Sequence, residues 1–575
     1  MSDLMMQINP GFVVILLGVL CALIPVNPVR KFLVTTAPIL AGIMIFQNYT
    51  SHEVIAGVIQ VGPTKLTTLR IDPLSMIWGY LFCLAGVLNA IYAFHERCKI
   101  TDSSALIYMG AAIAGVFAGD LLTLFIFWEM AAISSVFLVW KGGEGSFAAG
   151  VRYLAIHVLS GVLLLAGAVI YGRAKGSFDF GYIGLDAPGA WLMLIAMGIK
   201  CGFPFLHNWI QDAYPKASIT GTVILSAFTT KLALYALARG FPGTDLLIYI
   251  GAIMTCFPVF FAVIENDLRR VLSYSLNNQL GFMVCGIGIG SELALNGVAA
   301  HVVADVIFKG LLFMSMGAVM LRVGTTKASE LGGLFRSMPL TTLFCLIGAG
   351  SIAAFPLLSA FVTKSMIITA ALDNGNLVVM MMLLFASAGV MEHSGIKVPY
   401  FTFFAHDSGK RVKEAPWNML VAMGLASVLC IFFAFPWGGY QFLYSLLPYD
   451  VDYHPYTGDH VVFQMQLLFA AMLAFAFLKR IGAYPDERRA EILDFDWSYR
   501  RLGKNVMVWI DVMWTRLSAH VGNIRSKVIK SSGRKLFQFF SPAGGFSAAA
   551  PSGLPVILVG AMLVLALCVI YIGAQ

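Results

Sequence analysis

Five lysines lie inside apolar stretches of this sequence, and they are the residues whose chemistry is most evident. The chain carries 38 Lys and Arg residues, and most of them lie in the polar connections between apolar stretches. The five that lie within apolar stretches are all lysines: Lys200, Lys231, Lys309, Lys364 and Lys397. An ionisable group within a membrane is costly, so such residues are functional candidates. Arginine keeps its proton, whereas a desolvated lysine can lose it. A set made only of lysines therefore predicts a path for protons.

Two of these lysines lie close to a proline within an apolar stretch. Pro204 follows Lys200 by four residues, and Pro356 precedes Lys364 by eight residues. Proline removes a backbone hydrogen bond and kinks or breaks a helix. Two broken helices in corresponding positions of two halves are typical of transport sites between inverted repeats. The prolines therefore predict two half-channels, and we expect His207 to cap backbone carbonyls freed by the first break.

Acidic groups and histidines lie where they can share protons with the lysines. Glu129 is near the middle of the apolar stretch GDLLTLFIFWEMAAISSVFLVW, and we expect it to pair with a buried lysine. His301, Asp305 and Lys309 are spaced four residues apart, which places them on one face of a helix. Three titratable groups on one face predict a relay rather than packing. The predicted proton path comprises Glu129, Lys200, Lys231, His301, Asp305, Lys309 and Lys364.

Five further residues are candidates for an accessory role in this path: Asp120, His157, Glu392, His393 and Lys397. Asp120 lies at the outer end of the stretch that carries Glu129. A single histidine on an apolar helix, such as His157, serves packing as readily as proton transfer, so both alternatives stay open. Lys397 either lines an access port or extends its ammonium group to the membrane surface.

The sequence carries no pattern for covalent catalysis. Its nine cysteines are scattered without a CxxC pair, which argues against a zinc or iron–sulfur site. No phosphate-binding glycine loop, nucleophile constellation or cluster of metal ligands is present in the sequence. We therefore expect no cofactor and no metal site, and a transporter subunit rather than an enzyme.

Composition predicts a membrane protein made of helices. Hydrophobic residues make up 59% of the chain and charged residues 12%, with a mean hydropathy of +0.82, whereas soluble domains carry about 25% charged residues. A membrane span needs about 20 apolar residues. We predict an all-α polytopic membrane protein with about 16 spans, two inverted repeats containing broken helices, a C-terminal amphipathic segment and an anchor helix.

The distribution of charge predicts topology and segments. Lys and Arg concentrate in alternate connections, so the positive-inside rule places both termini outside the plasma membrane. Apolar residues recur at helical spacing from Val506 to Leu517, which predicts amphipathic helix at the cytoplasmic surface. The predicted segments are 1–103 (N-terminal transmembrane helices), 104–240 (first inverted repeat, a half-channel), 241–405 (second inverted repeat, a half-channel), 406–484 (peripheral transmembrane helices), 485–550 (amphipathic helical segment) and 551–575 (anchor helix).

Several motifs together resemble a known family. The stretches are DLLTLFIFWEMAAISS, GIKCGFPFLHNWIQDAYPKAS, LSAFTTKLALYALAR, DLRRVLSYSLNNQLG, HVVADVIFKGLLFM, ELGGLFRSMP and FPLLSAFVTK. As a set they resemble the antiporter-like membrane subunits shared by Mrp-type multisubunit cation/proton antiporters, respiratory complex I and membrane-bound hydrogenases. The resemblance implies two inverted half-channels joined by a polar axis at the membrane centre. It also implies that Glu129 pairs with Lys200, and that Lys231 and Lys309 are central relays. Lys364 would end the second half-channel.

The tail and the stretch IKVPYFTFF are most similar to the D subunit of Mrp-type antiporters. One position departs from the family pattern, because Asp305 stands where many relatives have a second histidine. An acid there can bind a cation or hold Lys309 charged.

The implied function is that of a proton-translocating subunit in a multisubunit Na⁺/H⁺ antiporter. Its partners would be other membrane subunits, protons, a monovalent cation and lipid, with no nucleic acid. One alternative is a proton-pumping subunit of a redox complex, either complex I-like or a membrane-bound hydrogenase. Another alternative is an energy-coupling membrane partner for inorganic-carbon uptake. The last is a passive scaffold for other membrane proteins, and the buried lysines disfavour this scaffold role.

Overall fold

The computed structural model describes residues 8–48, 53–62, 64–485, 492, 494–540, 557, 559–562 and 564. The chain divides into two compact units, Met1–Asp494 and Phe495–Gln575. The elements of the first unit up to the middle of the chain are α2 (Pro10–Leu23), α3 (Asn27–Gln47), β1 (Val54–Val61), β2 (Thr64–Ile71), α4 (Pro73–Tyr92), α5 (Lys99–Val116), α6 (Leu121–Trp140), α7 (Ser146–Lys175), α8 (Ala190–Cys201), α9 (Asn208–Ala213), α10 (Ile219–Ala227) and α11 (Thr229–Gly240).

The remaining elements of this unit are again mostly helices. They are α12 (Asp245–Ile264), α13 (Leu268–Ile289), α14 (Glu292–Val323), the 3₁₀ turns Ala328–Glu330 and Leu334–Arg336, α15 (Pro339–Ile352), α16 (Ser359–Asp373), α17 (Leu377–Val390), the π-helical turns Met391–Lys397 and Tyr400–Phe404, α18 (Trp417–Phe432), α19 (Gly439–Tyr444) and α20 (Gly458–Arg480).

The prediction of a helical polytopic membrane protein is confirmed. Within the described residues, nine helices are long and apolar enough to cross a membrane, and four more apolar helices have 10–17 residues. Not every predicted span is one long helix, because the chain leaves the helical path near each of the two prolines. The predicted anchor stretch at the C-terminus lies mostly outside the described residues.

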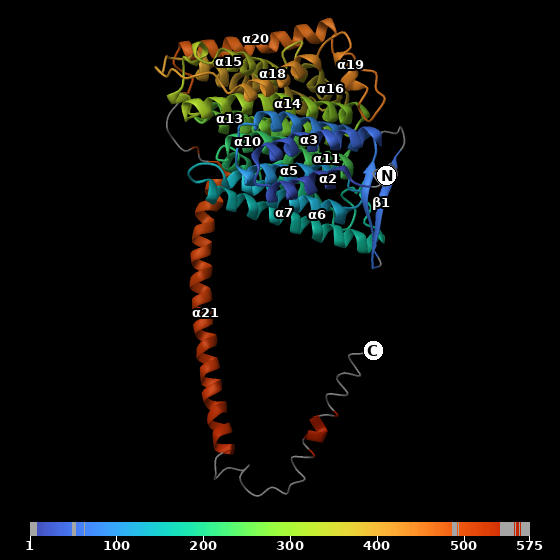
Figure 1. Ribbon diagram of the computed structural model, residues 1–575, viewed down its shortest axis with the longest axis vertical. Helices are drawn as coiled ribbons and strands as arrows, with labels where there is room; N and C mark the ends of the chain where they lie inside the picture. Colours follow the sequence, from blue (N-terminus) through green and yellow to red (C-terminus); the bar gives the residue numbers. More distant parts are fainter. Residues whose placement is uncertain are drawn as a thin grey trace. The chain divides into compact units, whose positions relative to one another are not determined.

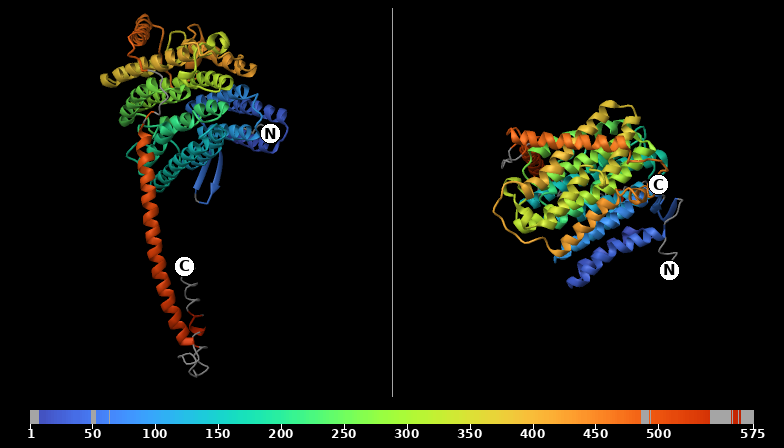
Figure 2. Two further views of the ribbon diagram at one scale, coloured as in Figure 1. Left: turned by 90° about the vertical axis from the view of Figure 1, so that its left-hand side faces the viewer. Right: turned by 90° about the horizontal axis from the view of Figure 1, so that it is seen from above.

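The long helices of the first unit lie side by side and roughly parallel, stacked in layers from α6 and α7 to α20 (Figure 1). The view from above shows the same parallel arrangement (Figure 2). Helix α14 occupies the core, since every residue from Ala294 to Val319 is buried. It packs against α10, α13, α15, α16 and α18. A helix that is buried all round must satisfy its polar groups with protein or water, so its ionisable residues carry the most information.

A β-hairpin in the N-terminal part is an addition to the predicted all-helical class. Strands β1 and β2 pair antiparallel, with Val54 opposite Ile71. Their Val, Ile and Thr content on either side of a Gly-Pro pair is a hairpin signal that the sequence interpretation did not use. Leu69 and Ile71 are buried in the main core, so the hairpin is fixed to the helices near the start of α4.

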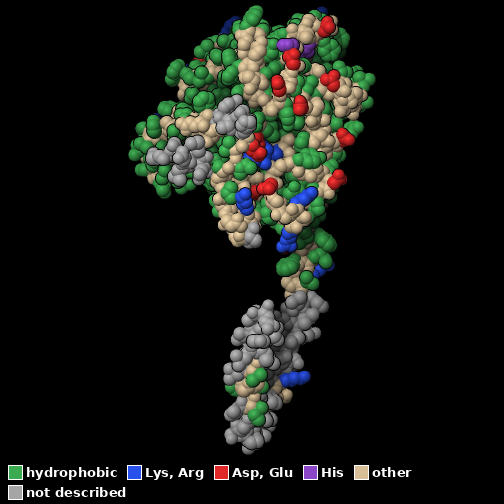
Figure 3. All heavy atoms as spheres, turned by 90° about the vertical axis from the view of Figure 1, so that its right-hand side faces the viewer, with side chains coloured by type: hydrophobic (Ala, Val, Ile, Leu, Met, Phe, Trp, Pro, Cys, Tyr) green, Lys and Arg blue, Asp and Glu red, His purple; other side chains and the backbone are tan. Residues whose placement is uncertain are grey.

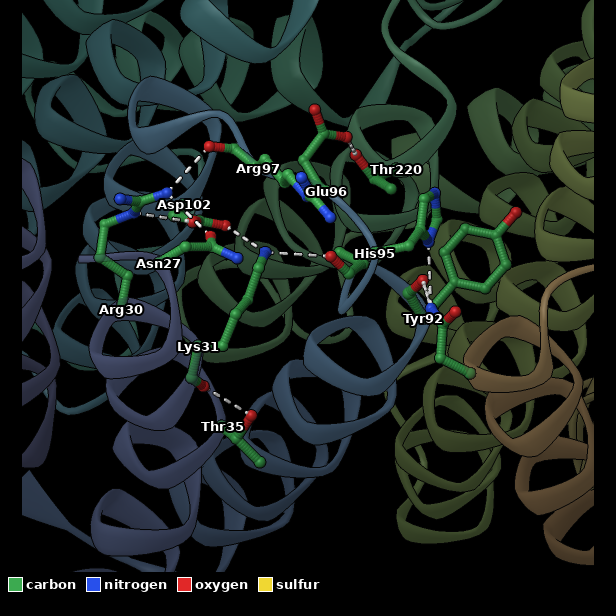
Figure 4. A network of polar contacts seen from close by, with 12 residues as sticks. Asn27, Arg30, Lys31, Thr35, Tyr92, His95, Glu96, Arg97, Asp102 and Thr220 are labelled. Carbon is green, nitrogen blue, oxygen red and sulfur yellow. Dashed lines mark hydrogen bonds and ion pairs between the residues drawn. The ribbon is translucent and has the colours of Figure 1, made fainter. Parts of the chain in front are cut away.

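A buried charge network joins the N-terminal helices. Arg30 and Lys31 of α3 share the carboxylate of Asp102 in α5 (Figure 4), at 3.2 Å and 2.7 Å. Arg30 also donates to the carbonyl of Arg97 at 2.8 Å, and Lys31 donates to that of Ala93 at 3.0 Å. Both basic residues were expected in a polar connection, but each is only 3% exposed. Because its charged groups are paired, this network is a structural joint.

One end of the helix stack is acidic. Figure 3 views the protein from the end at which β1 lies, and it shows Asp and Glu side chains gathered there among hydrophobic ones. Exposed acidic residues lie at the first positions of α12 and α14 and in the connection after α19: Asp245, Glu292, Asp450 and Asp452.

The second unit contains the helix α21 (Phe495–Phe540), which has 46 residues. It lies within the segment for which amphipathic helix was predicted. Apolar side chains at helical spacing, including Val506, Trp509, Met513 and Leu517, are exposed in this unit. The predicted pattern therefore forms one continuous helix.

Candidate functional site

The two predicted helix breaks are present, and they share one backbone geometry. Pro204 lies between α8 and α9, and Pro356 lies between α15 and α16. The residue after each proline has a positive φ, 70° at both Phe205 and Leu357. So does the residue two positions before each proline, with φ of 73° at Gly202 and 60° at Ala354. The prediction of two broken helices is confirmed.

The hydrogen bonds at the two breaks also correspond. The Phe203 amide donates to the Gly198 carbonyl at 2.9 Å, and the Phe355 amide donates to the Gly350 carbonyl at 3.0 Å. The sequences GIKCGFPFL and GSIAAFPLL align over these contacts. The shared pattern of Gly, Phe, Pro and Leu therefore encodes the break locally. Lys200 occupies the position that Ile352 holds in the second break.

Each broken helix carries a buried lysine beside an aromatic ring. Lys200 is 1% exposed; its Nζ donates to the Trp128 carbonyl at 2.7 Å and lies 4.2 Å from the centre of the Trp128 ring. Lys364 is also 1% exposed. Its Nζ donates to the Ile352 carbonyl at 3.3 Å and lies 4.8 Å from the Phe282 ring. Among the described residues, neither the Lys200 nor the Lys364 ammonium group is in direct contact with a carboxylate.

Glu129 does not form the predicted ion pair with Lys200. No ion pair joins these two residues in the described part of the chain, and Glu129 Oε1 has no hydrogen-bond partner there. A Cβ atom at Gly161 would lie 1.8 Å from Glu129 Oε1, so the carboxylate packs against this glycine of α7. The physical reason is that the Trp128 carbonyl takes the Lys200 ammonium group instead. Glu129 and Lys200 thus lie in the same region of the fold but form no ion pair with each other.

The centre of the site is an ion pair between α11 and α14, which lie in the two predicted half-channels. Lys231 Nζ of α11 lies 2.7 Å from Asp305 Oδ2 of α14, and both side chains are 0% exposed. Lys231 also donates to the Ser226 carbonyl at 3.0 Å. Asp305 has no ion pair with Lys309 among the described residues, and Lys309 Nζ faces the Leu272 carbonyl at 3.5 Å. Lys231 comes from another helix and yet lies nearer to Asp305 than Lys309, which is one turn away on the same helix.

His301 connects the three helices α13, α14 and α16. Its Nδ1 lies 2.9 Å from Thr363 Oγ1 of α16, and its Nε2 lies 3.1 Å from Gln279 Oε1 of α13. Gln279 in turn donates to Asn278 Oδ1 at 2.7 Å. Thr363 precedes Lys364 in the chain. The histidine thus lies in a continuous polar network next to the second lysine.

Asp120 has surroundings that fit a structural role, whereas both ring nitrogens of His157 are buried without a hydrogen-bond partner among the described residues. The Asp120 carboxylate accepts hydrogen bonds from the amides of Leu122 and Thr123, from Thr123 Oγ1 and from the amide of Thr67. It therefore caps α6 and holds the hairpin. The His157 ring packs between Tyr153 and Trp209, at 4.1 Å and 4.4 Å between ring centres.

The accessory residues of the π-helical turn make three different contacts. Glu392 Oε1 accepts a hydrogen bond from Tyr484 Oη, and His393 Nδ1 lies 2.9 Å from Ser394 Oγ. Lys397 is 2% exposed and donates to the carbonyls of Ala262, Val263 and Glu265 at 3.3, 2.5 and 2.7 Å. These carbonyls form the C-terminal end of α12, where a cation is favoured by the helix dipole. Lys397 therefore caps a helix and does not extend to a surface.

Two features were missed by the sequence interpretation. The expectation that His207 caps carbonyls freed by the break is wrong, because its Nε2 lies 3.1 Å from Asp494 Oδ2 and its Nδ1 has no hydrogen-bond partner among the described residues. Asn277 is fully buried, and both of its amide atoms lack a protein partner within the described residues. The run Asn-Asn-Gln in an otherwise apolar helix was the available signal, since buried amides need partners.

Known proteins are similar to this chain in sequence and fold. The family model described as NADH:quinone oxidoreductase/Mrp antiporter, TM matches residues 118–389. Hydrogenase-4 component B of Escherichia coli is 26% identical over 417 residues, covering 64% of this chain and 62% of that protein. The D subunit of the Na(+)/H(+) antiporter of Alkalihalophilus pseudofirmus is 30% identical over 327 residues, covering 52% of this chain and 66% of that protein. The chain thus spans less than two thirds of the length of these two curated relatives.

A solved structure has the same fold. A chain of the Mrp complex from a Dietzia species superposes with a TM-score of 0.69 at 19% sequence identity, covering 80% of this chain and 99% of that one. Residues 118–389 thus match the family described as NADH:quinone oxidoreductase/Mrp antiporter, TM, and the chain shares the fold of this chain of the Mrp complex.

Proposed function

We propose that the chain is the proton-translocating subunit of a multisubunit monovalent cation/proton antiporter, with Na⁺ as the exchanged cation. The observation that carries this proposal is the Lys231–Asp305 ion pair, which is fully buried and joins α11 to α14. A protein with a purely structural role gains little from such a pair, because apolar residues of similar volume are often as stable or more stable there. Similarity to the D subunit of an Na(+)/H(+) antiporter supports the choice of cation.

In the first half-channel the proton is controlled by Lys200 and Glu129. A carboxylate close to an ammonium group favours the charged form, whereas a desolvated lysine without one releases its proton more easily. In this structure Lys200 binds the Trp128 carbonyl and Glu129 lies against Gly161. This arrangement is the open state of the gate, in which Lys200 passes its proton toward Lys231.

In the centre the proton crosses from one half to the other. Asp305 holds Lys231 in the charged form, and separation of this pair lets the proton move to Lys309, one helical turn further along α14. Lys364 then receives it in the second half-channel. A membrane potential supplies about 2.3 kcal/mol per charge for each 100 mV, which helps to separate a buried pair.

The subunit works with other membrane subunits in the plasma membrane, with both termini outside. Cation transport takes place beside this path or in a partner. The second candidate function is proton pumping in a redox complex, which the similarity to Hydrogenase-4 component B favours. Purification of the intact complex separates the two, because iron–sulfur or flavin subunits would accompany the chain in a redox complex.

The test of the proton path is the variant Lys200→Arg. Arginine keeps the positive charge but holds its proton, so we expect proton flux to fall by about 100-fold or more. Flux is measured with a pH-sensitive dye in proteoliposomes that contain the whole complex. Lys31→Met is the matched control, because Lys31 is also a buried lysine but lies in the Asp102 network. Its flux per folded molecule should stay near wild type, and normal flux in Lys200→Arg would contradict the proposed path.

A second variant moves the Glu129 carboxylate without removing it. In Gly161→Ala the new Cβ would overlap Glu129 Oε1 and Cδ, so the carboxylate must shift. We expect flux to fall about as far as in Glu129→Gln, by about tenfold or more. Gly172→Ala is the control in the same helix, because its Cβ would meet the apolar ring of Phe178. Equal flux in Gly161→Ala and Gly172→Ala would show that the place of the Glu129 carboxylate does not matter.

A further inference from the structure

A carboxylate from the segment after α20 lies inside the first unit, at the first broken helix. Asp494 follows His207 by 287 positions in the chain, yet Asp494 Oδ2 lies 3.1 Å from His207 Nε2. The same oxygen accepts a hydrogen bond from Tyr274 Oη at 2.9 Å. The side chains of Asp494 and His207 are each 3% exposed, and Tyr274 is 0% exposed. We call these three residues the Asp494 port.

Aromatic rings of α12 fix the orientation of the port. The His207 ring packs on Phe257 with 4.6 Å between ring centres. The Tyr274 ring stacks on Phe261 at 5.4 Å with 11° between the ring planes. Such packing restricts the side chains, so the contacts to Asp494 are held in place.

The connection between α12 and α13 adds two charged groups. Glu265 and Arg270 are close enough to interact electrostatically with Tyr274, and they lie 3.4 Å from each other. Because Glu265 and Arg270 pair with each other, their charges offset one another. Within the port, the two groups in direct contact that can exchange a proton are Asp494 and His207.

Buried polar atoms lead from the port toward Lys200. A Cβ atom at Gly202 would lie 2.5 Å from Asn277 Oδ1 and 3.5 Å from His207 Cβ. His207 and Asn277 therefore flank Gly202, two residues after Lys200. His207 Nδ1 and both amide atoms of Asn277 have no protein partner in the part of the chain that the structure describes. Buried polar atoms of this kind bind ordered water, and such water would continue the route inward.

We propose that Asp494, His207 and Tyr274 form the proton port of the first half-channel, through which protons exchange between the aqueous phase and Lys200. The proposal rests on the proposed function of the chain and adds to it the group that loads the path. A proton from water binds the Asp494 carboxylate and passes to His207 Nε2. The imidazolium then releases the proton on Nδ1 through water beside Asn277 to a neutral Lys200.

Only O–H and N–H bonds form and break in this sequence. One proton moves inward and Asp494 returns to the carboxylate. His207 is left protonated on Nε2, and a proton shift from Nε2 to Nδ1 through bound water restores the starting tautomer. Tyr274 holds the carboxylate in place while it is charged.

The test uses the intact complex in proteoliposomes, with proton flux and the midpoint of thermal unfolding measured for each variant. In Asp494→Asn the shape of the side chain is kept but no proton can be carried, and we expect flux to fall by about tenfold or more. Asp494→Glu should keep most of the flux. In His207→Ala we expect a similar loss, partly restored by imidazole in the buffer, because the added base can carry the proton in place of the side chain. Imidazole should not restore Lys200→Arg.

Tyr274→Phe should slow flux less, because it removes one hydrogen bond to Asp494 but no proton carrier. Tyr92→Phe is its control, since the Tyr92 hydroxyl is also buried and donates to the Met314 carbonyl at 2.9 Å, away from the port. Its flux should match wild type.

Wild-type flux in Asp494→Asn would overturn the port. So would a loss of flux in His207→Ala that imidazole leaves unchanged and that follows the loss of folded protein, because the contact would then be structural. Failure of the proposed function has a different signature, namely normal flux in Lys200→Arg.

Discussion

Asp305→Asn is expected to stop proton transport and also to destabilise the protein. Lys231 and Asp305 are both 0% exposed and lie 2.7 Å apart, so the amide leaves a buried ammonium group without its counter-charge. Removal of one partner of a buried pair costs about 3–5 kcal/mol. We expect a lower midpoint of thermal unfolding in detergent and a fall in flux of about 100-fold or more. The physical reason is that Lys231 loses the Asp305 carboxylate. That carboxylate keeps Lys231 protonated while the two are paired, and their separation lets the proton leave.

The double variant Asp305→Asn with Lys231→Met separates stability from function. Methionine removes the unpaired charge and fills a similar volume, so stability should return toward the wild-type value. Flux should stay lost, because the link between the two half-channels is gone. Normal flux in the double variant would show that protons bypass this pair, and the central step of the path would have to be abandoned.

Lys364→Met is expected to abolish transport while leaving the protein as stable as before or more stable. Lys364 is 1% exposed and has the Ile352 carbonyl and the Phe282 ring as its direct partners. Replacing such an ammonium group by an apolar side chain removes a desolvation cost, with an expected gain of up to about 4 kcal/mol by analogy with buried pairs. Flux should fall by about 100-fold or more, because the second half-channel loses its lysine.

Lys31→Met supplies the opposite signature. Lys31 pairs with Asp102 at 2.7 Å and with the Ala93 carbonyl at 3.0 Å, so its loss should lower the unfolding midpoint and leave flux per folded molecule unchanged. Thermal unfolding and flux measured on both variants decide between a transport role and a structural role. If Lys364→Met behaves like Lys31→Met, the second half-channel does not depend on Lys364.

Local signals made much of the architecture predictable. Hydrophobic composition indicated the membrane class, and Pro204 and Pro356 indicated the two breaks, because each effect acts within a few residues along the chain. The structure gives both breaks the same φ of 70° after the proline. The hairpin of β1 and β2 also had a local signal, in its Val, Ile and Thr residues around Gly-Pro. It was missed because helical spans dominated the interpretation.

The sequence by itself thus determined that buried lysines lie beside broken helices in a membrane fold, since side-chain type, spacing and proline are properties of single segments. Only the tertiary structure decided which charges meet. Four-residue spacing placed Asp305 and Lys309 on one face of a helix, yet the fold brings Lys231 of α11 to Asp305. Asp494 reaches His207 from 287 positions away. Such pairs are set by the docking of whole helices, because a side chain takes the partner that the neighbouring helix presents, and no pattern within one segment contains that information.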